Sequence, residues 1–271
     1  MNDDQSPGQG RGGELAASNQ QKLARNSAQE GSVMEAMRSL ETEELARYCR
    51  DISVDGVIAQ STSLTLDRGQ TLWASKGSLL SYSPGIDWNL KIPGGAGKAV
   101  SRMLSGEGLS LTFVESKQDG SSVILGANQP GQLVTWDLSR GPIVCSQGAF
   151  VGALGDVEID VQVVRKAGAA LFGGGGLFMQ RLSGDGIAII HGAGDFIERR
   201  LAAGQKLLVS TGNLAVFSDQ VDYDIRRTGG CLKSIFGSEG FFMTEMTGPG
   251  WVMLQSLKKL PAQQAQQGGG S

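Results

Sequence analysis

His191 is the only histidine in this 271-residue chain, and it is the first residue to consider for catalysis. A histidine can serve as the general base for a serine nucleophile or as a metal ligand. The chain has no Gly-x-Ser-x-Gly elbow to support a serine hydrolase. Metal sites in double-stranded β-helix enzymes recruit two or more histidines. We expect His191 to lie near a strand end and predict no catalytic and no metal-binding residue; a hydrolase that uses His191 is the least favoured of three hypotheses.

Two glycine-rich stretches invite a comparison with phosphate-binding loops. In the stretch 94–99, Ile92 stands where a P-loop has its first glycine, and Ala99 lacks the hydroxyl that would hold magnesium after Lys98. The four glycines at 173–176 are followed by neither the lysine nor the helix that such loops need. We therefore expect no cofactor, and a small-ligand or nucleotide-binding regulatory module is the alternative hypothesis.

The glycine-rich stretch at 171–179 belongs to a set of three related segments, with the others at 104–111 and 236–243. Their last glycines, Gly108, Gly176 and Gly240, recur at intervals of 68 and 64 residues. A second motif, Leu-x-x-Gly, recurs from Leu66, Leu138 and Leu201. Recurrence at a long fixed period indicates an internal repeat. We predict a threefold internal pseudo-repeat, with units at about 57–126, 131–192 and 194–258.

Short apolar runs between glycine-rich turns indicate strands. Examples are the runs at 61–66, 132–136, 157–163 and 206–209, and the run at 157–163 alternates apolar and polar residues as a half-buried antiparallel strand does. These runs predict an all-β fold, with a single β-sandwich domain over 49–260.

The two ends of the chain have a different composition. Residues 1–31 and 261–271 are rich in Gln, Gly and Ser and poor in large apolar residues, so we expect disordered tails. Between the first tail and the sandwich, Ser32 and Glu35 have the spacing of a capping box, and the apolar residues that follow recur at helical spacing. We predict a helix over 32–48.

Composition limits the partners and the compartment. A net charge of −3 disfavours nucleic acid, which usually requires a clustered basic surface. The three cysteines, at 49, 145 and 231, are widely spaced and indicate neither a disulfide framework nor a zinc ribbon. The chain has no apolar run of membrane-spanning length, and its N-terminal residues lack the pattern of a signal or transit peptide. We expect a cytoplasmic protein.

An interaction surface is suggested by strands that carry consecutive apolar residues. Phe178 lies within Leu177-Phe178-Met179 and Phe242 within Phe241-Phe242-Met243, so both faces of each strand need cover. Lys98 and Arg102 flank the first glycine-rich segment and could join an anion-binding patch. We expect these four residues to contribute to a surface that binds a second copy of the chain, a protein partner or an anionic membrane.

Several of these motifs, in order, resemble the altered-inheritance-of-mitochondria family. The resemblance covers about 52–257 and rests on the residues at 102–109, 130–133, 171–178, 201–205, 212–217 and 248–252. It implies a bacterial member with a double-stranded β-helix-like sandwich akin to the tryptophan RNA-binding attenuation protein, and a tendency to oligomerise. The mitochondrial members are associated with the inner membrane and its cristae, and the family supplies no catalytic residues.

The leading functional hypothesis is a non-enzymatic scaffold or binding protein. We expect it to be a homo-oligomer that is peripheral to a membrane or a complex. The apolar strands and the lack of a recognisable catalytic set motivate this expectation.

Overall fold

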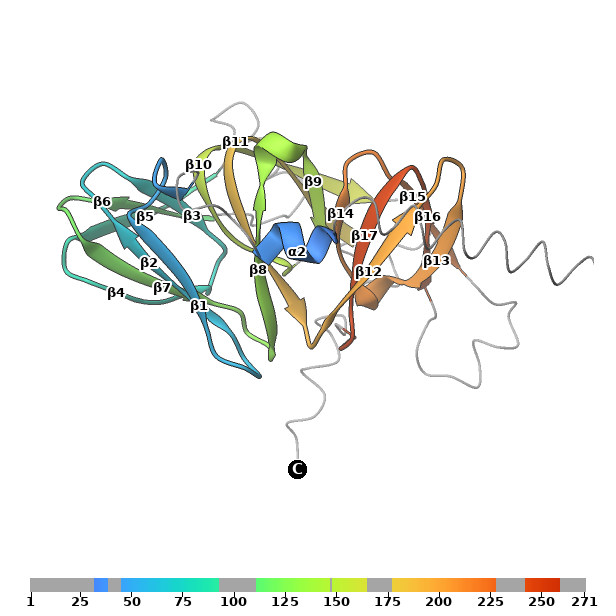
Figure 1. The fold of residues 1–271 in the computed structure, drawn as a ribbon, viewed down its shortest axis with the longest axis horizontal. Helices are drawn as coiled ribbons and strands as arrows, with labels where there is room; N and C mark the ends of the chain where they lie inside the picture. The colour runs from blue at the N-terminus through green and yellow to red at the C-terminus, as the bar shows by residue number, and fades with distance from the viewer. Residues whose placement is uncertain are drawn as a thin grey trace, which may run out of the picture.

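The computed structural model describes residues 32–38, 45–92, 111–146, 148–164, 177–227 and 242–258. These residues are mostly strands, and they form a sandwich of antiparallel sheets, which confirms the predicted all-β fold. Figure 1 shows the strands in three neighbouring groups that follow one another along the chain, from the cyan strands through the green and yellow ones to the orange and red ones.

The first group contains seven strands: β1 (Asp51–Asp55), β2 (Ser61–Leu66), β3 (Thr71–Ala74), β4 (Leu79–Tyr82), β5 (Ile86–Lys91), β6 (Leu111–Ser116) and β7 (Ser121–Gly126). β7 pairs with β2 and β4, and β6 pairs with β3 and β5. The strand predicted at 61–66 is present, and its burial alternates: Leu64 and Leu66 are buried, and Thr65 between them is only partly buried. They pack against Leu72 and Val114 of the facing sheet.

The third group contains six strands: β12 (Phe196–Leu201), β13 (Lys206–Ser210), β14 (Leu214–Ser218), β15 (Asp222–Arg227), β16 (Phe242–Thr247) and β17 (Gly250–Gln255), with a 3-10 turn η3 (Thr211–Asn213). β17 pairs with β12 and β14, and β16 pairs with β13 and β15. These four pairings match the four given for the first group, and β1, which pairs with β2, has no counterpart among the described strands of the third group. The core of this group contains Phe217 and Met246, both fully buried.

The middle group contains β8 (Gly131–Asp137), the 3-10 turn η1 (Leu138–Arg140), β9 (Ile143–Ser146), β10 (Phe150–Val164) and β11 (Leu177–Ala193). The two long strands pair with each other along almost their whole length. One half of β11 also pairs with β8 and the other half with β9. Each long strand therefore takes the place of two shorter ones in the other groups.

One sheet runs through all three groups. Its order is β12, β17, β14, β9, β11, β10, β3, β6 and β5, with β8 also paired to β11. A four-stranded sheet (β1, β2, β7 and β4) and a three-stranded sheet (β13, β16 and β15) complete the arrangement. The groups are joined where β3 pairs with β10 and where β9 pairs with β14.

The turns after β2 and β12 have the same hydrogen bonds, as their shared Leu-x-x-Gly-Gln sequence suggests. Gln70 Oε1 accepts from the Asp67 amide at 2.7 Å, and Gln205 Oε1 accepts from the Ala202 amide at 2.9 Å. Gly69 and Gly204 have φ of 84° and 74°. Glycine is favoured there because a side chain is strained at positive φ.

The helix α2 (Val33–Arg38) lies across β8 (Figure 1). Val33 and Met37 are buried in the core of the middle group. The Glu198 carboxylate of β12 caps this helix: it accepts from Ser32 Oγ at 2.8 Å and from the Val33 and Met34 amides, each at 3.2 Å. The capping box predicted from the sequence gave the role of the capping carboxylate to Glu35, whereas in the structure Glu198 has this role. Of the helix predicted over 32–48, residues 39–44 lie outside the described ranges, and residues 46–48 form a turn.

Glu198→Gln should weaken this anchor. Burial alone would raise the pKa of Glu198, but hydrogen bonds from Ser32, Val33, Met34 and Arg200 outweigh it, and the net pKa is lowered. A lowered pKa stabilises the fold above the unfolded-state value of about 4.3, and this contribution is lost as the pH falls through the folded-state pKa. We expect Glu198→Gln to reduce the free energy of unfolding by about 1 to 3 kcal/mol at pH 7.

Urea unfolding at pH 7 and at pH 3 to 4 measures this effect, and the difference between the wild type and Glu198→Gln should shrink at acidic pH. Glu35→Gln is the matched control, since Glu35 is absent from the cap, and it should change stability by less than about 0.5 kcal/mol. An equal loss in both variants would contradict the assignment of the cap.

Some sequence predictions fall on residues outside the described ranges. These are the two tails, the segments 104–110, 171–176 and 236–241, and the P-loop-like stretch 94–99. The glycine-rich segments 104–110, 171–176 and 236–241 lie along the chain between β5 and β6, between β10 and β11, and between β15 and β16, respectively. Across the described ranges, no helix has the length and apolar character needed to cross a membrane.

Candidate functional site

The four residues predicted for an interaction surface are not placed together by the described part of the chain. Lys98 and Arg102 lie outside the described residues. Phe178 is on β11 and Phe242 is on β16, and the structure describes only the backbone at these two positions. The predicted surface therefore stays a prediction.

His191 lies near the end of β11, where it is paired with Leu133 of β8. Its side chain is 1% exposed, and its amide donates to the Ala149 carbonyl at 2.7 Å. It borders a hollow of about 270 Å³ formed by the turn after β3, the segment after β7 and the start of β10. The polar side chains around this hollow belong to Ser75, Lys76, Ser78, Asn128, Gln129 and His191.

This hollow offers hydrogen-bonding groups but no set of acids and bases arranged for a reaction. Among the described residues that line it, Lys76 and His191 are those that can carry a charge, and none is a carboxylate. Elsewhere among the described residues, no group of three or more His, Cys, Asp or Glu side chains is arranged to hold a metal ion.

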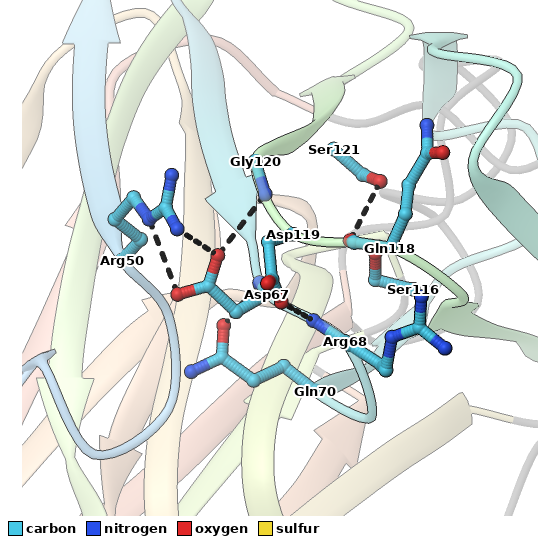
Figure 2. Close-up of polar contacts among 9 residues, drawn as sticks. All are labelled: Arg50, Asp67, Arg68, Gln70, Ser116, Gln118, Asp119, Gly120 and Ser121. Carbon is cyan, nitrogen blue, oxygen red and sulfur yellow. Dashed lines mark hydrogen bonds and ion pairs between the residues drawn. The ribbon is translucent and has the colours of Figure 1, made fainter.

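Charged residues converge where the β2–β3 turn meets the β6–β7 turn (Figure 2). Arg50, just before β1, donates from Nε and Nη2 to the Asp67 carboxylate at 3.1 and 2.7 Å. The Gly120 amide donates to the same carboxylate at 3.0 Å, and Asp119 accepts from the Arg68 amide at 3.0 Å. Both carboxylates thus hold turns together. In the corresponding turn after β12, Ala202 replaces Asp67.

Asp185, within the long strand β11, is a third acid that holds separate segments together. Its carboxylate accepts from the Tyr48 hydroxyl at 2.5 Å and from Arg47 Nη2 at 3.0 Å. Burial and then the hydrogen bond to Asp185 raise the pKa of Tyr48 to about 12. The contact fastens the segment before β1 to the long strand β11.

Tyr48→Phe should therefore change the alkaline stability of the protein. A pKa raised above the unfolded-state value of about 10 stabilises the fold below pH 10, and this contribution is lost as the pH rises from 10 to 12. We expect Tyr48→Phe to cost about 1 to 2 kcal/mol at pH 7. Urea unfolding at pH 7 and pH 11 should show a smaller difference between variant and wild type at the higher pH, and a difference that grows would contradict this assignment.

The most distinctive surface feature is a set of exposed apolar side chains on edge strands. Leu80 and Tyr82 of β4 are 59% and 46% exposed, and Trp88 and Leu90 of β5 are 44% and 60% exposed. Trp88 Nε1 donates to the Tyr82 hydroxyl at 3.0 Å, so the exposed residues of the two strands meet at this pair. At the other end of the protein, Leu208 of β13 is 51% exposed.

Sequence reasoning missed these residues, although a signal was present. Leu79-Leu80 and Leu207-Leu208 are adjacent apolar pairs in strands, the pattern that singled out Phe178 and Phe242. Adjacent residues of a strand point to opposite faces, so one member of such a pair needs cover from another layer or another molecule. Within the described residues, β4 and β13 are each the last strand of their sheet. No further strand pairs with their outer edges, and their apolar residues stay exposed.

The fold and this surface define a class: a sandwich of antiparallel sheets with exposed apolar residues on edge strands. Residues 53–257 match the family model described as Mitochondrial biogenesis AIM24, and the chain belongs to that family. A relative from Streptococcus pyogenes serotype M6, printed as an uncharacterized protein, is 30% identical over 202 residues, which are 72% of this chain and 80% of the relative.

A crystal structure of another Streptococcus pyogenes protein has the same fold, with a TM-score of 0.65. It is 24% identical, and the similarity covers 77% of this chain and 94% of that one. The likeness to the tryptophan RNA-binding attenuation protein stays a prediction.

Proposed function

We propose that this protein is a non-enzymatic scaffold that associates with further copies of itself and with a protein complex. The observation that carries the proposal is the exposed apolar surface on the edge strands β4 and β5, formed by Leu80, Tyr82, Trp88 and Leu90. An edge strand with exposed apolar residues is a template for pairing with another chain. Exposed apolar patches mark interaction sites in folded proteins.

The disposition of the charged residues supports a structural role. Asp67, Asp119 and Asp185 hold turns and segments together instead of facing a common hollow. Arg181 likewise makes a two-pronged ion pair with Asp219, with both distances at 2.9 Å, which joins β11 to the turn after β14. Such contacts stabilise a rigid framework, which a scaffold requires.

Sedimentation velocity over a hundredfold range of protein concentration tests the self-association. A chain of 28.4 kDa should sediment as a larger species whose share rises with concentration. A single species of monomer mass at every concentration would overturn this part of the proposal.

The partner beyond a second copy is proposed to be protein. A net charge of −3 opposes general attraction to an anionic membrane. Flotation with phosphatidylserine vesicles at low salt should leave the protein unbound, and its recovery with the vesicles would favour the membrane instead.

The hollow beside His191 favours a second candidate function, the binding of a small polar ligand. Its size of about 270 Å³ is near the lower end of small-molecule sites. A ligand that binds the folded state raises the melting temperature. A thermal-shift screen of nucleotides and small polar metabolites, repeated with Ser78→Ala, would test it: the candidate requires a shift that this variant reduces, and the absence of any shift would count against it.

A further inference from the structure

The two places where neighbouring strand groups join have the same geometry. At the first, β3 pairs antiparallel with β10, with Trp73 opposite Ala153. At the second, β9 pairs antiparallel with β14, with Val144 opposite Phe217. Because β9 occupies the place of β3 in its own group, and the start of β10 occupies the place of β14, each group joins the next through equivalent strands.

Two details show that this correspondence is residue by residue. The three equivalent strands β4, β10 and β14 each have a register shift at the same place. The shift lies between Leu79 and Ser81, between Phe150 and Gly152, and between Leu214 and Val216. A serine hydroxyl crosses both junctions to the residue just before that shift. Ser75 Oγ donates to the Phe150 carbonyl at 2.5 Å, and Ser146 Oγ donates to the Leu214 carbonyl at 2.6 Å.

Among the described residues, the first and the third strand group each have one of these equivalent strands with no further strand paired to its outer side. β4 corresponds to β14 and is the last strand of the four-stranded sheet. β13 corresponds to β3 and is the last strand of the three-stranded sheet. Ser210, at the end of β13, occupies the position of Ser75 and Ser146, as the shared turn before β13 and β3 shows.

Exposure differs between the joined strands and the open ones at equivalent positions. Ala153 and Phe217 are fully buried, whereas Tyr82 at the same position of β4 is 46% exposed. Val144 is 3% exposed, whereas Leu208 at the same position of β13 is 51% exposed. Trp73, at the same position of β3, is partly buried. The positions that lack cover are thus ones that the two internal junctions cover wholly or in part.

We propose that β13 of one copy pairs antiparallel with β4 of a second copy and so repeats the internal junction between molecules. The register of the internal junctions places Ser81 opposite Val209, Tyr82 opposite Leu208, and Ser83 opposite Leu207 of the other copy. Ser210 Oγ then donates to the Leu79 carbonyl. The inference rests on the proposed self-association and identifies the surfaces that carry it.

The composition of the two edges fits this pairing. Natural edge strands are commonly protected by charged residues or proline, and neither Leu79–Tyr82 nor the segment 207–210 contains one. Lys206, at the start of β13, is held by Glu245 of the neighbouring strand at 2.8 Å. Pairing of these edges would therefore bury no unpaired charge. Because the two edges differ, the contact is heterologous and adds copies head to tail into a ring or a filament.

Cysteine trapping tests the register. One preparation carries Tyr82→Cys and a second carries Leu208→Cys, both with Cys231→Ser to remove a competing thiol. Opposite residues of an antiparallel pair have Cα atoms about 4.5 to 5.5 Å apart, within the range of a disulfide. We expect a covalent dimer when the two preparations are mixed and oxidised, and none from either alone. Val57→Cys, at an 89% exposed position in the turn after β1, replaces Tyr82→Cys as the control and should give no dimer.

A second measurement keeps the test independent of disulfide chemistry. Leu208→Lys should shift the sedimenting species to monomer mass, with an unchanged melting temperature of the monomer. Leu257→Lys changes a residue of matched exposure, 50%, outside both edges and should leave the assembly intact. If the assembly persists in Leu208→Lys and no disulfide forms between the cysteines at positions 82 and 208, the proposed β13–β4 junction is wrong. The proposed self-association would then hold through another surface. A wild-type chain that is monomeric at all concentrations would overturn the self-association itself.

Discussion

Gly131→Ala is expected to destabilise the protein by about 3 to 5 kcal/mol, because strain and overpacking add at this position. Gly131 begins β8, and its amide donates to the Ile58 carbonyl at 2.8 Å. A Cβ at this position would lie 2.0 Å from the Gly192 carbonyl oxygen and 2.6 Å from His191 Nε2. The Gly192 carbonyl oxygen belongs to the backbone of the paired strand β11, which cannot move aside without breaking hydrogen bonds between β8 and β11. Urea unfolding should show a lower midpoint with an unchanged slope.

Gly141→Ala is the matched control. Gly141 also has a positive φ, 131° against 158° for Gly131, but nothing lies within 4 Å of a Cβ built on it. Alanine there meets backbone strain alone, with an expected cost of about 1 to 2 kcal/mol. Equal losses at the two glycines would show that the close approach of β8 to β11 does not require glycine.

Phe217→Ala should have an effect of similar size, about 3 to 5 kcal/mol, because it leaves a cavity where the middle and third groups join. Phe217 is fully buried, pairs with Val144 and packs edge-on against Tyr223 at 5.2 Å between ring centroids. Calorimetry of the variant should show a large fall in melting temperature. A change of less than 1 kcal/mol would mean that this junction contributes little to folding.

Tyr82→Ala makes the equivalent change at the open end of the protein. Tyr82 occupies the position in the first group that Phe217 occupies in the third. Trp88, which donates a hydrogen bond to Tyr82, occupies the position of Tyr223. Since Tyr82 is already 46% exposed, its removal should cost the monomer about 1 kcal/mol or less. Its effect should instead fall on self-association, so the pair of variants separates a contact that stabilises the fold from one that stabilises the assembly. A Tyr82→Ala monomer as unstable as Phe217→Ala would contradict this division.

Local sequence patterns predicted the strands and their inward faces. The alternation at 157–163 placed Val157 and Ile159 inward and Glu158 outward, and these residues lie that way in β10. The Leu-x-x-Gly motifs after β2 and β12 form turns, and their glycines have positive φ. Patterns of this kind are readable because the period of a strand and the conformational freedom of glycine act within a few residues.

The sequence by itself thus determined the all-β class, several strands and the family resemblance. The tertiary structure decided which partners meet across the chain. Glu198 caps a helix whose first residues lie 164 to 166 positions earlier in the chain, and no local spacing could identify it in place of Glu35. Likewise, Tyr82 and Phe217 occupy the same place in their groups, yet one is exposed and the other buried. Burial at such a position depends on whether a further strand pairs with the edge, and pairing joins segments that are distant in sequence.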